Sequence, residues 1–415
     1  MNVLITGAQF GNKGAESMLY TTVDEVMKRW PDSNVYFGTY NDEIYNESLY
    51  TFHKFYFSHR GIQIALGGPK AIFVYFKEFI KDFIKICLRR TNNLGHLFFV
   101  KKHIEDIDLI IDVSGFNLGV NWTKGTHSLY IDKIRLAEKH NIPIYLMPQS
   151  FGPFDYKDSS MNPIKTELGI TLKYPRLIFA REKEGYDELI EEFTLNNVLL
   201  STDLVLQNNY VNWKNVYVQT PKLDIPKIEH EKVVGIIPNS QCFKFGDKSN
   251  IINLYQSIVN KLLSDGYHVV VFRHSREDLP ICNEIKSLFS DESKVFLEEK
   301  EFSCFEYSEY VKQFNFVICS RYHGLVHAYK NNVPCVALGW AVKYKELTEC
   351  LGQGMYSFDI TQNLGDSGRI LDALTNMEKD LDKEKRIIKD RLEEIQLNNC
   401  FDLVEKDFNS LKSSN

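Results

Sequence analysis

The chain of 415 residues is long enough for two domains, each with its own hydrophobic core. Hydrophobic residues make up 44% and charged residues 25% of the sequence, proportions that exclude a disordered or fibrous protein. The formal net charge of −6 gives no overall positive field that would attract nucleic acid. We therefore expect any anionic ligand to be held by a local cluster of cations.

The N-terminus and the apolar segments favour a cytoplasmic location. Residues 2–6 form a short apolar run that ends in glycine, without the basic region, apolar stretch and cleavage site of a signal peptide. No stretch of about 18 apolar residues is free of charge, as a membrane span requires. The eight cysteines are scattered without the spacing of metal ligands, so we expect reduced, buried cysteines and no metal site.

Short runs of β-branched residues alternate with amphipathic segments along most of the chain, a pattern typical of parallel α/β layers. The runs predict strands at 2–6, 35–38, 109–113, 144–147, 177–180, 233–238, 268–272, 316–319 and 333–339. The apolar spacing predicts helices at 15–30, 127–140, 183–193, 252–263 and 377–396.

The domain organisation follows from a break in this pattern. Polar residues and two prolines without a clear period occupy 207–230, which we interpret as the connection between domains. We expect an N-terminal Rossmann-like domain at 1–206 and a C-terminal one at 231–375. The charged segment 376–415 is expected to form a helix that packs across the domain junction.

The segment 71–90 is amphipathic, with aromatic and aliphatic side chains on one face and lysines and arginines elsewhere. Such a helix can lie on a membrane surface, which would suit a lipid-linked substrate. Most amphipathic helices instead pack their apolar face on a sheet, and the sequence favours this second interpretation. The apolar face comprises Phe73, Phe76, Ile80, Phe83, Ile84 and Cys87.

Glycine-bearing turns follow several strands of the first half and would share one rim of a parallel sheet. The sequence GNKGAE at 11–16 lets a backbone approach a ligand, and the helix that follows offers free N–H groups. The spacing is not that of a dinucleotide fingerprint, and a plain strand-to-helix turn explains it equally well. The candidate acceptor contacts in these turns are Asn12, Glu16, Gln149 and Ser150.

Arg181 follows the strand at 177–180 and can pair bidentately with a carboxylate or a phosphate. An ion pair with Asp187 or Glu184 is an equally good interpretation. Asp203 ends this half of the chain, where it is a candidate for capping a helix or for binding.

The densest group of polar residues lies in the second half, in the sequence SRYHG after the strand at 316–319. If a helix begins near Tyr322, Arg321 and His323 lie at its positive end, where an anion is favoured. Gly324 would let a ligand approach the backbone. Together with Ser320, these residues favour a functional site over a structural one.

Two neighbouring strand ends carry further candidates. Lys343 follows the strand at 333–339 and lies within reach of the same ligand. Arg273 and His274 follow the strand at 268–272, where a solvated polar turn is as good an interpretation as a role in binding.

Taken in order, these segments resemble the polysaccharide pyruvyl transferase family. The resemblance is carried by GNKGAE at 11–16, PQSFGP at 148–153, REKE at 181–184, STD at 201–203 and SRYHG at 320–324, with Pro334 and Lys343. It implies an α/β protein with two Rossmann-like domains facing a cleft, similar to the B-type glycosyltransferase fold.

The resemblance also implies an enzyme that moves pyruvate from phosphoenolpyruvate to a sugar of a cell-envelope or exopolysaccharide precursor, as a cyclic ketal. Phosphoenolpyruvate would be a co-substrate, no cofactor would be needed, and the acceptor would be a sugar or a lipid-linked oligosaccharide. A glycosyltransferase that uses a nucleotide sugar, and a non-catalytic sugar-binding protein, remain alternatives.

The resemblance assigns roles to the residues of the second half. Arg181, Arg321 and Lys343 would neutralise the carboxylate and phosphate of the donor, with Ser320 and Gly324 beside them. His323 would be the general acid or base, with Arg321 also at the catalytic centre, and the bound phosphate would keep the imidazole protonated.

Overall fold

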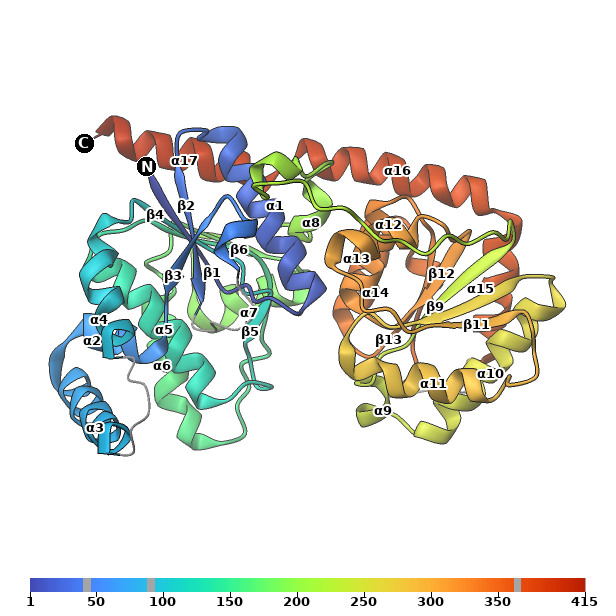
Figure 1. Ribbon diagram of the computed structural model, residues 1–415, viewed down its shortest axis with the longest axis horizontal. Helices are drawn as coiled ribbons and strands as arrows, with labels where there is room; N and C mark the ends of the chain where they lie inside the picture. The colour runs from blue at the N-terminus through green and yellow to red at the C-terminus, as the bar shows by residue number, and fades with distance from the viewer. Residues whose placement is uncertain (40–45, 88–93, 362–366, 415) are drawn as a thin grey trace.

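The computed structural model describes residues 1–39, 46–87, 94–361 and 367–414, and Figure 1 shows two α/β units side by side. In each unit a parallel sheet is covered by helices on both faces, which explains why the central strands are continuous apolar runs. The fold class predicted from the sequence is confirmed.

The first sheet has the strand order β3-β2-β1-β4-β6-β7-β8, with β5 paired to β6. Its strands are β1 (Asn2–Thr6), β2 (Asn34–Thr39), β3 (His53–Tyr56), β4 (Leu109–Asp112), β5 (Phe116–Leu118), β6 (Ile144–Phe151), β7 (Leu177–Ala180) and β8 (Val198–Leu200). The helices of this unit are α1 (Lys13–Arg29), α2 (His59–Leu66), α3 (Gly68–Cys87), α4 (Leu94–His103), α5 (Lys124–Lys139), α6 (Asn162–Thr171), α7 (Lys183–Phe193) and α8 (Leu204–Gln207).

The second sheet has the order β11-β10-β9-β12-β13-β14. Its strands are β9 (Val233–Ile237), β10 (His268–Phe272), β11 (Val295–Glu298), β12 (Phe316–Cys319), β13 (Cys335–Gly339) and β14 (Ser357–Asp359). Its helices are α9 (Cys242–Phe245), α10 (Lys248–Ser264), α11 (Leu279–Ser287), α12 (Cys304–Val311), α13 (Tyr322–Lys330), α14 (Val342–Cys350) and α15 (Ser367–Lys379).

Two further helices follow where the sequence predicts one. The helix α16 (Leu381–Leu397) runs from the second unit towards the first, and α17 (Cys400–Ser414) continues along the first unit (Figure 1). The α17 helix is fixed there by an edge contact between the rings of Phe408 and Trp30, 5.7 Å apart, and by a 2.6 Å hydrogen bond from Tyr145 to Asp407.

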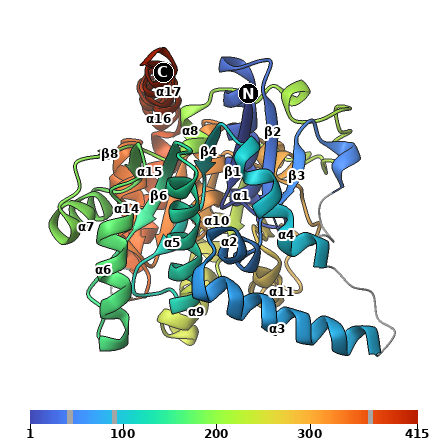
Figure 2. The same cartoon turned by 90° about the vertical axis from the view of Figure 1, so that its left-hand side faces the viewer.

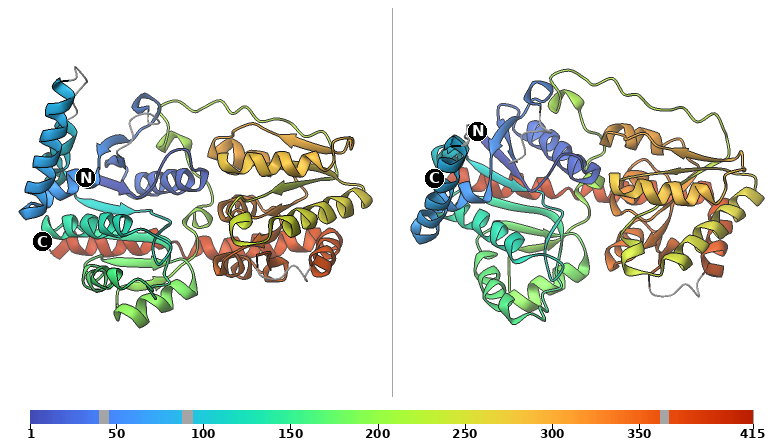
Figure 3. Two further views of the ribbon diagram at one scale, coloured as in Figure 1. Left: turned by 90° about the horizontal axis from the view of Figure 1, so that it is seen from below. Right: turned by 60° about the horizontal axis from the view of Figure 1, so that its bottom comes forward.

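The helix α3 stands apart from the body of the first unit, as Figure 2 and the left panel of Figure 3 show. The side chains of Phe73, Phe76 and Ile80 are exposed, so the expectation that this face packs on the sheet is wrong for these three residues, and Ile72 beside them is exposed as well. The side chains of the other three residues of the predicted face lie outside the described residues. Among the described residues, no helix combines the length and the apolar character needed to cross a bilayer.

Candidate functional site

In both sheets the strand order reverses beside the first strand of the unit. The strand β1 pairs with β2 on one side and β4 on the other, and β9 pairs in the same way with β10 and β12. Crevices in open parallel sheets form at the carboxyl ends of the strands that flank such a switch. The site is therefore expected at two rims, one after β1 and β4 and one after β9 and β12.

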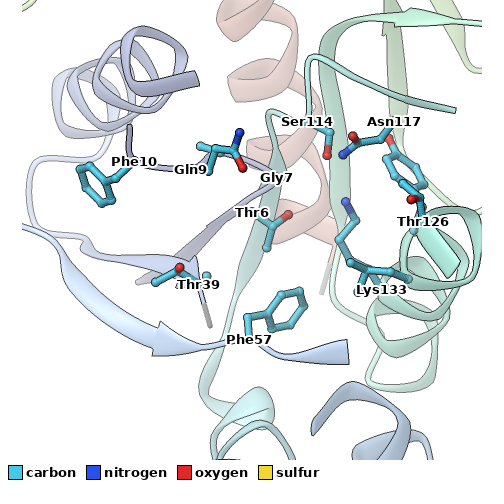
Figure 4. A pocket seen from close by; sticks show the side chains of 14 residues that line it. Thr6, Gly7, Gln9, Phe10, Thr39, Phe57, Ser114, Asn117, Thr126 and Lys133 are labelled. Atoms are coloured by element: carbon cyan, nitrogen blue, oxygen red, sulfur yellow. The ribbon is translucent and has the colours of Figure 1, made fainter. Parts of the chain in front are cut away.

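A cavity of about 220 Å³ opens at the first rim, and Figure 4 shows the side chains around it. Gly7 adopts a φ of +88°, and a methyl group at this position would overlap the Ser114 side chain, so only glycine fits the turn after β1. The polar part of the wall is formed by Thr6, Gln9, Ser114, Asn117, Tyr130 and Lys133.

The floor of this cavity is a buried ion pair. The Lys133 ammonium contacts Asp112, and the Thr6 hydroxyl donates to the same carboxylate at 2.7 Å. Burial lowers the pKa of Lys133, while Asp112 opposes that shift. The second Asp112 oxygen and the Ser114 hydroxyl have no hydrogen-bond partner among the described residues. This floor offers hydrogen bonds without a net charge, which suits a hydroxylated ligand.

The predicted acceptor contacts do not line this cavity. Asn12 caps α1 by accepting from the backbone of Gly14 and Ala15, and Glu16 accepts from the backbone N–H of Gly11 at 2.8 Å. Gln149 is fully buried and accepts from Tyr130, and Ser150 is buried between Arg181 and Glu182. All four polar groups already have protein partners, so their role in binding an acceptor stays a prediction without support from their placement.

At the second rim, Arg321 lies between β12 and α13 and is paired with carboxylates. Its Nε and Nη2 donate to the two oxygens of Asp278 at 2.7 and 2.6 Å, and Nη2 also contacts Glu277 at 2.7 Å. No described residue accepts a hydrogen bond from Nη1, which leaves one edge of the guanidinium for a ligand. The backbone at the start of α13 has no side-chain cap.

Ser320 and Gly324, the neighbours of Arg321 in the predicted donor site, serve the packing of the domain. The Ser320 hydroxyl is buried 2.8 Å from the Tyr255 hydroxyl. A methyl group at Gly324 would lie 2.6 Å from Cys319 Sγ, so this glycine permits the helix to pack on its own strand. Packing therefore explains why a glycine stands at position 324, and the approach of a ligand there stays a prediction.

His323 faces the first unit across the domain junction. A methyl group on Gly14, in the first turn of α1, would overlap the imidazole ring, so the glycine allows the two units to approach. The ring Nε2 has no hydrogen-bond partner among the described residues and lies 3.6 Å from an Asp203 oxygen. Burial, with the nearby charges of Arg181 and Lys343, lowers the pKa of His323 to about 3.

Arg181 is buried and fully engaged, and its planar group lies 4.2 Å from the ring of Tyr322. It donates to Glu182, to Ser150 and, at 3.0 Å, to Asp203. The same Asp203 oxygen faces His323. Arg181 therefore fixes the carboxylate beside the histidine, and its charge is already balanced by two acidic side chains.

Lys343 differs from both arginines because no described residue forms an ion pair with it. The carboxylate whose charge acts on Lys343 is Glu182, which already accepts from Arg181 and from the Ser150 hydroxyl. The ammonium lies 5.5 Å from the Phe116 ring and 5.1 Å from the Trp340 ring. Burial and the charge of Arg181 lower the pKa of Lys343 to about 8.

Arg273 and His274 form no solvated turn. His274 is buried, and its carbonyl accepts from the Lys13 ammonium of the first unit at 2.7 Å. His327 also joins the two units through a 3.0 Å hydrogen bond with Ser17. Arg273 donates to the Glu299 carbonyl of its own unit. His274 and His327 hold the two units together behind His323.

The short strand β5 joins the two rims. Phe116 contacts Lys343 of the second unit, whereas the next residue, Asn117, lines the cavity of the first. Successive side chains of a strand point to opposite faces. A cation and a neutral polar cavity therefore lie on the two faces of one strand. Among the described residues, no group of three or more histidine, cysteine or acidic side chains could hold a metal ion.

The sequence model of polysaccharide pyruvyl transferases matches residues 12–341, which include α1, Ser114 and Lys133 of the first rim, and Arg321 and His323 of the second, whereas residues 6–9 and Lys343 lie outside the matched range. The chain belongs to the polysaccharide pyruvyl transferase family. Among curated proteins, no significant sequence match was found.

Solved structures show that this pyruvyl transferase family member shares its fold with enzymes of nucleotide-sugar chemistry. A UDP-GlcNAc 2-epimerase from Neisseria meningitidis is 14% identical, with 94% of each chain covered and a TM-score of 0.54. A second UDP-GlcNAc 2-epimerase, from Methanocaldococcus jannaschii, is 12% identical over 90% of this chain and 92% of its own, with a TM-score of 0.51. The spinosyn rhamnosyltransferase SpnG is 9% identical over 98% of this chain and 100% of its own, with a TM-score of 0.50. These likenesses confirm the expected two-domain fold.

The sequence analysis missed the residues that make the first-rim cavity polar. Lys133 lies within a predicted helix and looks like an ordinary surface lysine, and Asn117 belongs to a strand of three residues that shows no period. The only available signal was the acidic end of the strand at 109–113, because a buried Asp112 requires a buried cation.

Proposed function

We propose that this pyruvyl transferase moves pyruvate from phosphoenolpyruvate to a sugar of a cell-envelope or exopolysaccharide precursor, forming a cyclic ketal. The observation that carries the proposal is Lys343, the cation at the second rim that no described carboxylate neutralises. A substrate with a carboxylate and a phosphate supplies the missing negative charge. The neutral polar cavity at the first rim supports a sugar as the acceptor.

The donor is expected between the starts of α13 and α14. Both helices follow adjacent parallel strands, and neither has a side-chain cap on its first N–H groups. Helix N-termini favour anions through these N–H groups and the helix dipole. With Lys343 and the open edge of Arg321, they would hold the two anionic groups of phosphoenolpyruvate.

In this proposal His323 is the acid. In the unliganded enzyme the imidazole is neutral, since its pKa is lowered to about 3. Bound anions would offset the charges of Arg181 and Lys343, raise that pKa and let the imidazole carry a proton. Asp203, held by Arg181, would then face an imidazolium.

The bonds and protons of the proposed pyruvyl transfer can be followed through these groups. The imidazolium protonates the methylene carbon of phosphoenolpyruvate, and the neighbouring carbon becomes an oxocarbenium-like centre. One sugar hydroxyl adds there and loses its proton, the bond from that carbon to the phosphate oxygen breaks, and phosphate leaves. A second hydroxyl of the same sugar closes the ketal and loses its proton.

A binding test separates this proposal from its alternatives. Thermal unfolding is followed with phosphoenolpyruvate, with inorganic phosphate and with UDP-GlcNAc. We expect phosphoenolpyruvate to raise the unfolding midpoint of the native enzyme, and Lys343→Met to reduce that shift. The matched control is Lys345→Met, two residues along α14, where 69% of the side chain is exposed. An unfolding midpoint raised only by UDP-GlcNAc would favour a glycosyltransferase. A midpoint that none of the three ligands shifts would favour a non-catalytic protein.

A further inference from the structure

The side of α3 that faces away from the protein is apolar. Ile72, Phe73 and Phe76 are 72%, 68% and 64% exposed, and Ile80 is exposed beside them. Their spacing of three or four residues places these side chains on one face of the helix. An amphipathic helix in water normally turns this face inward, so α3 presents to the solvent the face that needs a partner.

The flank of this apolar face is basic although the whole chain is acidic. Lys70 and Lys77 are seven residues apart, on one stripe of α3, and no described residue forms an ion pair with either. The acidic Glu78 is buried and is matched by two cations, Arg60 at 2.8 Å and Lys81 at 3.0 Å. The net charge of the flank is therefore positive, against −6 for the chain.

We propose that α3 lies on an anionic lipid bilayer, with its apolar face among the acyl chains and its lysines at the headgroups. Aromatic and aliphatic side chains flanked by lysines are the features of a helix that rests in the plane of a bilayer. The length of 20 residues includes several charges, which agrees with a helix that lies on a bilayer and does not cross it.

Charge also argues against a second copy of the chain as the partner. A two-fold contact through this face would bring Lys70 and Lys77 close to the same lysines of the other copy. Anionic headgroups attract these lysines instead.

The helix lies close to the proposed acceptor cavity. Phe57 lines that cavity, and α2 begins two residues later and leads into α3. The α2 helix is tied to α5 by Asp132, which accepts from Gln63 at 3.2 Å and contacts His59 at 2.9 Å. The next residue, Lys133, forms the floor of the cavity. A bilayer under α3 would therefore bring a lipid-linked sugar to the first rim, with the enzyme at the cytoplasmic leaflet. This step rests on the proposed function.

The test is co-sedimentation of the full chain with vesicles of phosphatidylcholine alone or mixed with phosphatidylglycerol. We expect binding to the mixed vesicles only, weakened at high salt. The double variant Phe73→Ser, Phe76→Ser should bind at least about tenfold more weakly, because both side chains leave the acyl region. Its matched control is Ile170→Ser, Leu397→Ser, two side chains with 65% and 82% exposure on other helices.

The electrostatic part is tested by Lys70→Glu, Lys77→Glu, with Lys383→Glu, Lys389→Glu on α16 as the control. Equal binding to neutral and anionic vesicles, or binding that survives Phe73→Ser, Phe76→Ser, would overturn the proposal. A dimer that this variant dissociates, without any binding to vesicles, would assign the face to a second copy. All variants should keep the thermal shift with phosphoenolpyruvate, so a native enzyme that binds vesicles but not phosphoenolpyruvate contradicts the proposed function alone.

Discussion

The rims of the two sheets differ in how their charges are balanced. At the first rim Lys133 is neutralised by Asp112, and one Asp112 oxygen and the Ser114 hydroxyl have no hydrogen-bond partner among the described residues. At the second rim Arg321 is neutralised by two acidic side chains, whereas Lys343 is not. The unpaired charge of Lys343 is the reason why the proposed anionic donor is expected at the second rim, and the balanced charge of the first rim is the reason why the proposed sugar acceptor is expected there.

Loss of the proposed acid at the second rim should reduce the activity most strongly. His323→Gln should lower kcat about 10²- to 10⁴-fold, the usual contribution of general acid catalysis, because glutamine carries no transferable proton. Release of phosphate from phosphoenolpyruvate measures kcat, and thermal unfolding shows whether the donor still binds. The control is the exposed His230→Gln. A rate within a few-fold of the native enzyme would remove His323 from the reaction.

The contact between the rims is tested by Gly14→Ala. The new methyl group would overlap the His323 ring, and we expect a loss of about 1–3 kcal/mol in the free energy of unfolding, with a matching loss of activity. Gly368→Ala is the control, since this glycine is also the second residue of a helix but has no neighbour within 4 Å of a methyl group. Chemical denaturation measures both. Equal effects of the two variants would show that the domain contact tolerates expansion.

Acid should weaken the junction behind the second rim. Burial lowers the pKa values of His274, His323 and His327 below the ordinary value of 6.5. Below that pH the unfolded chain takes up protons that the folded protein does not. The free energy of unfolding therefore decreases as the pH is lowered, by up to about 1.4 kcal/mol per pH unit for each histidine.

The contribution of a single histidine is isolated by His327→Gln, which keeps a polar partner for Ser17. Urea unfolding between about pH 7 and pH 5 should show that the free energy of unfolding depends less steeply on pH than in the native chain, because the variant takes up one proton fewer on unfolding. An unchanged slope would mean that His327 is protonated in the folded protein as easily as in the unfolded chain.

The smallest effect is expected at the first rim. Ser114→Ala removes a buried hydroxyl that has no hydrogen-bond partner in the described part of the chain, so the free energy of unfolding should change by less than about 1 kcal/mol. If the hydroxyl binds the acceptor, KM for the acceptor should rise a few-fold while the thermal shift with phosphoenolpyruvate stays the same. An effect on donor binding would contradict the separation of the two rims.

The fold was largely predictable, and the strands that were missed share a physical reason. β3, β8, β11 and β14 are the edges of the two sheets, and β5 pairs with a single neighbour. Edge strands are short and half solvated, so they lack the apolar run that marks a central strand. In β8, for example, two of the three side chains are exposed.

The candidate site was less predictable, because its chemistry depends on contacts between distant residues. The position of Arg321 and His323 at the start of a helix followed from the local pattern. That Arg321 is paired with Asp278, or that Glu182 is held by Arg181 while Lys343 forms no ion pair with a described residue, depends on the tertiary fold. For the same reason the outward face of α3 could not be read from its periodicity alone.

The chain passes between the two units twice, through the segment after α8 and again through α16, and Figure 1 places both crossings on the same side of the molecule. In the left panel of Figure 3 these crossings lie at opposite edges of the molecule. Together with the hydrogen bonds of Lys13 to the His274 carbonyl and of Ser17 with His327, these two crossings join the units at several separated points, which restricts how far one unit can turn against the other.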